Sequence, residues 1–156
     1  MIPNKENSVN GYILAGGKSP RMGTDKGLLQ FNGKPIIQHV IEQLQPAVNE
    51  VVIVCGNPAY KRFGLEIIED LVKKVGPAGG IYSALNHTKD SQTFIVSCDM
   101  PFVSSSAINF IIQNSLLTQI TLPSLHGKTE PLFGVYTKDC SVKWRELIEK
   151  GVVKLR

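Results

Sequence analysis

Short apolar runs alternate with segments of helical periodicity along this chain. Residues 11–15 form an apolar run that ends in two glycines, and residues 50–55 form a β-branched run that Gly56 and Pro58 stop. Between these runs, apolar residues recur at helical spacing after Pro35: Ile36, Ile37, Val40, Ile41 and Leu44. A strand, a helix and a second strand in this order predict a βαβ unit with parallel strands.

The same alternation continues toward the C-terminus. Residues 65–68 and 93–98 predict further buried strands, and residues 116–122 and 132–136 are weaker strand candidates. Three more helices are predicted. The first follows the glycines of residues 76–80 and runs through Leu85, and the second is capped by a serine of residues 104–106 and carries Ile108, Ile111 and Ile112. The third spans residues 140–149 and ends at Gly151, and its mostly inward residues are Val142, Trp144, Leu147 and Ile148. We therefore expect an α/β protein with a three-layer α/β/α, Rossmann-like architecture and a mostly parallel sheet, and any ligand at the carboxyl ends of its strands.

The size and composition are those of one globular domain. The chain has 156 residues, of which 42% are hydrophobic and 19% charged, so a disordered or fibrous class is not indicated. We expect residues 1–156 to form a single domain. Residues 1–10 are polar and carry no apolar run, and we expect them to be a flexible N-terminal segment.

Charge and cysteine content exclude several classes of partner. The formal charge is +4, but basic residues are scattered and aromatic residues make up only 7%, so we expect no nucleic-acid partner. No run reaches the eighteen or so apolar residues that a membrane helix needs, so we expect no membrane partner. Three cysteines without a CxxC pair indicate neither a disulfide framework nor a zinc site: Cys55, Cys98 and Cys140. We expect a cytoplasmic protein.

A glycine-rich, basic loop follows the first predicted strand. Gly16, Gly17 and Gly23 allow the backbone to approach a ligand closely, and the loop's N–H groups can form an anion-binding nest. Three cations accompany these glycines: Lys18, Arg21 and Lys26. Such a loop suits a triphosphate, although a glycine-rich connector with solvated basic side chains remains open at this point. The spacing is neither that of a P-loop nor the GxGxxG of a dinucleotide fold.

The full amino-acid sequence of this loop is more specific. Residues 14–26 read LAGGKSPRMGTDK, which closely resembles the LAGGxSxRMGxDK signature of the molybdenum cofactor guanylyltransferases. Four further segments follow in the family's order and at similar spacings: Gly33-Lys34-Pro35, Ile68-Glu69-Asp70, Gly76-Pro77-Ala78-Gly79-Gly80 and Ser97-Cys98-Asp99-Met100-Pro101-Phe102. The resemblance covers about residues 11–136 and implies the nucleotidyltransferase fold of that superfamily.

The resemblance also implies roles for residues that their own patterns leave ambiguous. Asp99, at the end of a predicted strand, could bind Mg²⁺ or cap a turn, and the matching aspartate of the family is the magnesium ligand. Asp70 could accept hydrogen bonds from a guanine or a ribose or simply end a strand, and its family counterpart belongs to the nucleotide site. The implied catalytic residues are Lys26, Arg21 and Asp99, and the implied nucleotide-binding residues are Leu14, Ala15, Gly16, Gly17, Lys26, Asp70, Gly79 and Asp99.

The activity implied is transfer of GMP from GTP to the phosphate of molybdenum-molybdopterin, with release of pyrophosphate. Catalysis would rest on in-line positioning, Mg²⁺ at Asp99 and charge stabilisation by Lys26 and Arg21. The implied partners are GTP, molybdenum-molybdopterin as acceptor and other proteins of molybdenum cofactor biosynthesis.

Three alternatives stay open. A cytidylyltransferase of the same superfamily usually reads LAAG, whereas this chain has Gly16, whose missing Cβ we expect to leave room for a purine. A sugar-phosphate nucleotidyltransferase matches the loop less well. A non-catalytic nucleotide-binding module is the third, because members of the family usually continue beyond residue 156. One departure from the family concerns Asn57, which is offset by one residue and is better interpreted as a turn residue than as a base contact.

Overall fold

The structure is a computed structural model that describes residues 8–16 and 23–155. Its centre is a 6-stranded sheet in the order β5-β4-β1-β6-β10-β7. The strands are β1 (Val9–Leu14), β4 (Val51–Val54), β5 (Glu66–Ile68), β6 (Gln92–Ser97), β7 (Ile120–Thr121) and β10 (Phe133–Thr137). β1, β4, β5 and β6 are parallel, whereas β10 pairs antiparallel with both β6 and β7. The sheet is therefore mixed but mostly parallel, as expected.

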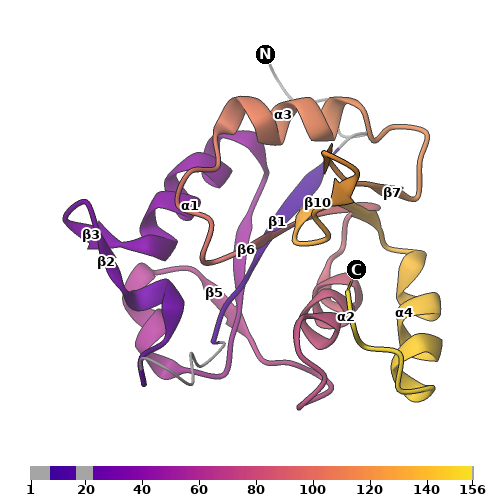
Figure 1. Ribbon diagram of the computed structural model, residues 1–156, viewed down its shortest axis with the longest axis horizontal. Helices are drawn as coiled ribbons and strands as arrows, with labels where there is room; N and C mark the ends of the chain where they lie inside the picture. Colours follow the sequence, from indigo (N-terminus) through magenta and orange to yellow (C-terminus); the bar gives the residue numbers. More distant parts are fainter. Residues whose placement is uncertain (1–7, 17–22, 156) are drawn as a thin grey trace.

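Helices cover both faces of this sheet (Figure 1). They are α1 (Ile36–Leu44), α2 (Pro77–His87), α3 (Ser105–Gln113) and α4 (Cys140–Glu149). On one face, Ile13 and Val96 pack with Ile37 of α1 and Ile108 of α3. On the other face, the side chains that alternate with these, such as Tyr12, pack against α2 and α4. The two cores confirm the expected three-layer α/β/α architecture.

The order of the strands places a crevice between β1 and β6. The chain runs from β1 through α1 to β4 on one side of β1, and after β5 it returns through α2 to β6 on the other side. Because parallel crossovers are right-handed, connections that proceed in opposite directions place their helices on opposite faces of the sheet. Ligands of such sheets bind at the carboxyl ends of the strands where the direction reverses. Here that point lies between the residues that follow Leu14 and Ser97.

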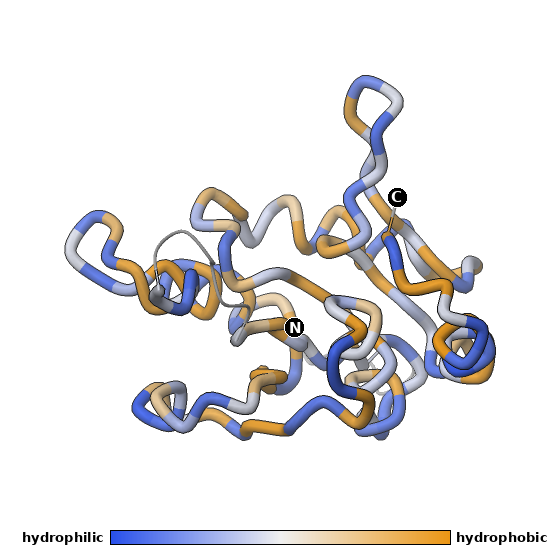
Figure 2. The backbone as a smooth tube through the Cα atoms, turned by 60° about the horizontal axis from the view of Figure 1, so that its bottom comes forward, coloured by the Kyte–Doolittle hydropathy of each residue, from blue (hydrophilic) through white to orange (hydrophobic). Residues whose placement is uncertain are grey.

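Several short elements have no periodic signal in the sequence. A two-stranded hairpin, β2 (Gln30–Phe31) and β3 (Lys34–Pro35), projects from the body of the molecule with a hydrophilic turn at its tip (Figures 1 and 2). A second hairpin joins β8 (Ser124–Leu125) to β9 (Lys128–Thr129). Three 3₁₀ helices complete the described elements: η2 (Lys26–Leu28), η3 (Gln45–Ala47) and η4 (Pro58–Phe63).

Helix boundaries agree closely with the prediction where a proline, a glycine or a capping serine marks the helix end. α1 begins after Pro35 and ends before Pro46, and α4 spans the predicted residues 140–149. At α3, the Ser104 hydroxyl accepts a hydrogen bond from the Ala107 N–H at 3.2 Å, which confirms the predicted serine cap. Gly151 ends α4 with a φ of 73°.

Four expectations need correction. β1 begins at Val9, so residues 9 and 10 lie buried in the sheet and are not part of a flexible segment. Only residues 120 and 121 of the candidate strand 116–122 pair with a neighbour. α2 begins at Pro77 and includes two of the glycines that we expected to precede it. Val142 is 65% exposed, because it lies on the outer face of α4.

All three cysteines are free and buried. In the described parts of the chain, no helix is long and apolar enough to span a membrane.

Candidate functional site

A cleft of about 420 Å³ opens at the carboxyl ends of β1 and β6. It is lined by Leu14, Ala15, Gly16, Lys26, Val54, Asp70, Lys74, Gly76, Pro77, Gly80, Ser97, Cys98, Asp99 and Leu132. The sheet pairing extends one residue past the strand ends, since the Cys98 N–H donates to the Leu14 carbonyl at 3.0 Å. This bond sets the turn that carries Asp99 beside the turn that carries Gly16. The structure thus brings together most of the residues that the sequence singled out, while Gly17 and Arg21 lie outside the described residues.

Gly16 is required by backbone conformation and packing. Its φ is 87°, in the left-handed region that glycine adopts without strain. A Cβ placed on Gly16 would lie 2.9 Å from the Cys55 sulfur, which is closer than van der Waals contact allows. The missing side chain therefore faces Cys55 in the protein interior. The expectation that Gly16 leaves room for a purine was wrong in its reason, since the space in question holds a sulfur atom.

Lys26 and Asp99 face each other across the cleft. The Lys26 ammonium lies 3.8 Å from Oδ2 of Asp99, and both side chains are half-exposed. The other carboxylate oxygen, Oδ1, accepts a hydrogen bond from the Ser97 hydroxyl at 2.6 Å. Ser97 thus fixes the rotation of the carboxylate, and Oδ2 stays directed toward the lysine. An exposed ion pair at this distance contributes little stability, so a polyanion can separate the two charges easily.

One carboxylate oxygen of Asp70 lacks a hydrogen-bond donor among the described residues. Its Oδ1 atom is buried and has no hydrogen-bond partner in the described part of the chain. Burial raises the pKa of Asp70 above its ordinary value, and the nearby charge of Lys73 only partly opposes this effect. A buried acceptor that lacks a donor costs free energy, which a ligand that supplies N–H or O–H groups would offset.

The start of α2 forms one wall of the cleft. Gly76, with a φ of 64°, precedes the helix, and Pro77 and Gly80 line the cleft. Gly79 does not line it: its N–H donates to the Gly76 carbonyl at 3.1 Å, and an added Cβ would lie 2.6 Å from the Val72 carbonyl oxygen. Gly79 thus allows the close packing of the loop before α2, and Gly80 is the glycine within α2 that lines the cleft.

Lys74 is a further cation of the cleft that the sequence did not reveal. It lines the cleft beside Gly76 and has a φ of 65°. A non-glycine residue in this conformation costs about 1 kcal/mol or more. The segment before α2 has no periodic pattern, so only a glycine or asparagine in place of Lys74 could have indicated the turn.

Asp25, next to Lys26, is a second residue whose contacts sequence reasoning missed. Its Oδ1 accepts hydrogen bonds from the Tyr60 hydroxyl and, at 3.2 Å, from the Gly27 N–H. Its Oδ2 lies 3.5 Å from the side-chain nitrogen of Asn57. Asn57 in turn caps η4, since its Oδ1 accepts from the Ala59 N–H at 3.0 Å, which confirms its prediction as a turn residue.

The donor set of the cleft suits a magnesium ion that is shared with a substrate. Among the described residues, no group of three or more His, Cys, Asp or Glu side chains could enclose a metal ion. Magnesium keeps several waters and is typically held by one or two carboxylates together with substrate phosphates. Asp99 fits this requirement, because it is half-exposed at the cleft and its Oδ2 faces Lys26 while Oδ1 is bonded to Ser97.

His39, His87 and Trp144 are engaged by neighbouring groups of the protein. His39 bonds the Phe31 carbonyl at 2.7 Å, and His87 bonds both the Tyr12 hydroxyl and the Glu66 carboxylate. Trp144 packs edge to face on Tyr136, with ring centroids 6.0 Å apart.

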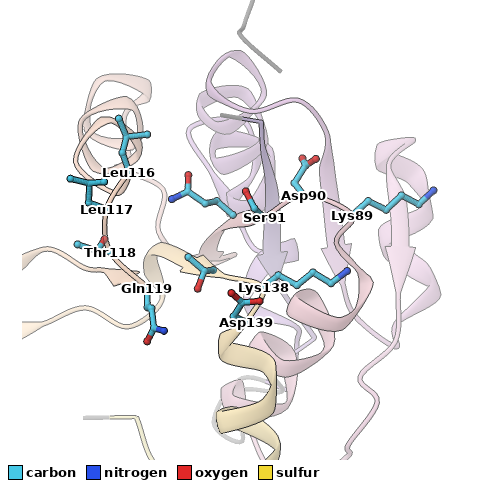
Figure 3. Close-up of a pocket in the computed structure, with 11 residues that line it drawn as sticks. Lys89, Asp90, Ser91, Leu116, Leu117, Thr118, Gln119, Lys138 and Asp139 are labelled. Atoms are coloured by element: carbon cyan, nitrogen blue, oxygen red, sulfur yellow. The ribbon is translucent and has the colours of Figure 1, made fainter. Parts of the chain in front are cut away.

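A larger hollow, of about 660 Å³, lies at the opposite end of the strands from the cleft (Figure 3). It is formed where β6 begins and β10 ends, and its walls include Asp90, Leu117 and Lys138. This is the amino end of β6, where open α/β sheets do not place their ligands. The Lys138 ammonium is bound to the Thr88 carbonyl at 2.6 Å, so this cation is already engaged by the protein. The cleft at Gly16 and Asp99 is the better candidate.

Comparisons with known proteins identify the family of this chain. Residues 11–156 match the model of the MobA-like NTP transferase domain. A Flavobacterium johnsoniae protein named "probable molybdenum cofactor guanylyltransferase" is 36% identical over 145 residues, which are 92% of this chain and 76% of the relative. A Thermococcus sibiricus protein with the same name is 37% identical over 149 residues, covering 90% of this chain and 75% of the relative.

A solved structure gives the same result in three dimensions. The molybdopterin-guanine dinucleotide biosynthesis protein A of Archaeoglobus fulgidus superposes with a TM-score of 0.79 at 28% identity, over 93% of this chain and 75% of that protein. Together with the family match over nearly the whole length, these similarities establish the family. The chain belongs to the MobA-like NTP transferases.

Proposed function

We propose that this protein transfers GMP from GTP to the terminal phosphate of molybdenum-molybdopterin and releases pyrophosphate. The activity follows the names of its relatives, which are about one third identical over nine tenths of the chain. The observation that carries the proposal in this molecule is the pairing of Lys26 with Asp99 at the switch point of the sheet, directly beside the turn at Gly16. A cation and a carboxylate at this position are what transfer of a nucleotidyl group requires.

The nucleotide would lie with its base toward Asp70 and its phosphates toward Lys26. Leu14, Ala15 and Gly16 line the cleft, and Asp70 offers acceptors to the N–H groups of a guanine or the hydroxyls of a ribose. The N-terminus of α2, with its partial positive charge, borders the same space. Gly17, predicted to bind the nucleotide, belongs to this part of the proposal.

The chemical step needs little from the protein beyond position and charge. The acceptor phosphate is already a nucleophile, so no general base is required. Asp99 would hold the magnesium ion, which would supply neutralising charge for the phosphates when bound. Ser97 keeps the Asp99 carboxylate oriented, and the Lys26 ammonium would leave Asp99 for the phosphates and stabilise charge on the departing pyrophosphate. Arg21 is proposed to assist Lys26. Proteins that make or use the molybdenum cofactor are the proposed protein partners.

A nucleotide panel tests the proposed substrate. Thermal unfolding is measured with Mg²⁺ and GTP, CTP, ATP or UTP. GTP at about one hundred times its Kd should stabilise the native state by about 2.7 kcal/mol, or about 5–10 °C for a domain of this size. The other nucleotides should stabilise it less. A larger shift with CTP would assign the protein to cytidylyl transfer instead.

Two variants test the roles of the paired charges. Lys26→Ala and Asp99→Ala should each lower the rate of pyrophosphate release, measured with GTP and molybdenum-molybdopterin, by about 10²–10³-fold. Both should leave the melting temperature nearly unchanged, because the side chains are half-exposed. Lys143→Ala is the matched control, since this lysine pairs with Glu146 on the outer face of α4. Near-normal turnover by either cleft variant would contradict its role.

A further inference from the structure

One short segment supports both ends of the glycine-rich loop. The segment of residues 55–60, called here the anchor segment, follows β4 and leads into η4. It contacts Gly16, where the loop begins, and Asp25, where the loop ends. These two positions are nine residues apart in the sequence, yet they rest on side chains of the same turn.

The contact at the start of the loop is made by Cys55. Its sulfur fills the space beside the α-carbon of Gly16, as described above. The same sulfur accepts a hydrogen bond from the Asn57 N–H at 3.1 Å. Cys55 is 2% exposed, and burial raises the pKa of its thiol. The thiol is therefore a neutral packing group that connects Gly16 to the anchor segment.

The contact at the end of the loop is made by Tyr60 and Asn57. Tyr60 is fully buried, and its hydroxyl reaches the Asp25 carboxylate past Gly27. A Cβ on Gly27 would lie 2.5 Å from the Tyr60 oxygen, so only a glycine at this position leaves space for the hydroxyl. Burial and the bond to Asp25 raise the pKa of Tyr60 well above its ordinary range, so the hydroxyl remains a donor.

Asp25 is engaged by the protein rather than by the cleft. Its two oxygens face the Tyr60 hydroxyl, the Gly27 N–H and the Asn57 side-chain amide. Asp25 is absent from the residues that line the cleft, whereas its neighbour Lys26 lines it. The bond to the Gly27 N–H also caps η2, whose first residue is Lys26. Asp25 thus determines where η2 begins and where the Lys26 side chain leaves the backbone.

We infer that the anchor segment positions both ends of the glycine-rich loop, and that Asp25 and Tyr60 are positioning residues that act on the reaction through Lys26. The inference rests on the proposed function. It assigns Asp25 of the loop signature to hydrogen bonds within the protein and not to the metal or the phosphates. It further makes Tyr60, which is remote in sequence from the signature, part of the same machinery.

Tyr60→Phe tests this inference, with Tyr12→Phe as the matched control. Both variants remove one hydroxyl from a fully buried tyrosine that bonds another side chain, but Tyr12 bonds His87 and not the loop. Since a misplacement of about 1 Å at a reacting group costs about a hundredfold in rate, Tyr60→Phe should lower kcat at least about tenfold, with a smaller change in the KM for GTP. Amide hydrogen exchange of residues 25–29 should accelerate in Tyr60→Phe only.

Conservative substitution distinguishes positioning from ligation. Asp25→Asn keeps an oxygen that can accept from Tyr60 and Gly27, so it should retain much more activity than Asp25→Ala. The double variant Tyr60→Phe/Asp25→Ala should be no slower than Asp25→Ala alone, because both changes break the same bond.

The outcomes separate the inference from the proposed function. A wild-type protein that does not transfer GMP contradicts the proposed function, and the exchange measurement still reports on the contact between Tyr60 and Asp25. The inference is overturned if Tyr60→Phe matches Tyr12→Phe in both exchange and kcat. It is also overturned if Asp25→Asn is as inactive as Asp25→Ala, since a lost metal or phosphate ligand would give that result.

Discussion

Gly16→Ala separates two explanations for the glycine pair at the start of the loop. If Gly16 made room for a purine, alanine would weaken GTP binding and favour CTP. In the structure, the added methyl group would meet the Cys55 sulfur at 2.9 Å, on a backbone with a φ of 87°. We therefore expect a general loss of order at the loop and no exchange of nucleotide preference.

The size of the loss follows from these two contacts. An alanine in the left-handed region costs about 1–2 kcal/mol, and crowding in a packed interior adds about 1–3 kcal/mol. Together they should lower the melting temperature by about 4–20 °C for a domain of this size. Binding of GTP and CTP should weaken by similar factors, because both nucleotides use the same loop backbone.

A double variant isolates the part due to crowding. Cys55→Ala removes the sulfur and leaves the Cys55 Cβ 3.9 Å from the new methyl group, which is ordinary contact. Gly16→Ala should therefore cost less in the Cys55→Ala background than in the wild type, whereas the cost of the backbone conformation should remain. Thermal unfolding and titration with GTP and CTP measure both effects. If Gly16→Ala kept the wild-type melting temperature and bound CTP better than GTP, the packing argument would be refuted.

Two further predictions concern the other wall of the cleft. Because folding raises the pKa of Asp70 above its ordinary value of 3.8, stability from this group is present below 3.8 and is lost as the pH rises through the raised value. Asp70→Asn should thus raise the melting temperature near neutral pH, with a gain that shrinks on acidification, and it should weaken GTP binding; an equal melting temperature of both proteins across the pH series would contradict the assigned burial. At the start of α2, Gly79→Ala should lower the melting temperature more than Gly80→Ala. The methyl group added at Gly79 would lie 2.6 Å from the Val72 carbonyl oxygen, which is backbone, whereas the one added at Gly80 would lie 3.1 Å from the movable Leu14 side chain. Gly80→Ala should in turn weaken nucleotide binding more, and the reverse order in either measurement would show that the two glycines have been assigned the wrong surroundings.

The sequence predicted the fold where local signals are strong. α1 lies between two prolines and α4 ends at a glycine, so their boundaries could be read residue by residue. The direction of β10 could not, because an apolar run of five residues looks the same in parallel and antiparallel pairing. Two-residue strands such as β2 and β3 depend on tertiary contacts and are too short to produce a periodic hydrophobic pattern in the sequence.

The site was predictable to the extent that its residues follow strands. Asp99 and Gly16 come directly after apolar runs, and parallel strands bring their carboxyl ends together. Tyr60 lies in a 3₁₀ helix and reaches Asp25 only through the folded chain, so no spacing in the sequence could connect them. The packing of Cys55 against Gly16 could not be predicted for the same reason, because Cys55 is distant from Gly16 along the chain.

Transfer of the α-phosphate tests the central claim most directly. Wild-type protein is incubated with Mg²⁺, molybdenum-molybdopterin and GTP that carries a label on the α-phosphate, in parallel with equally labelled CTP. We predict that the label of GTP enters a guanine dinucleotide form of the acceptor, that unlabelled pyrophosphate is released in equal amount, and that removal of magnesium with EDTA stops both. Label transfer from CTP alone, or binding of GTP without release of pyrophosphate, would contradict the account.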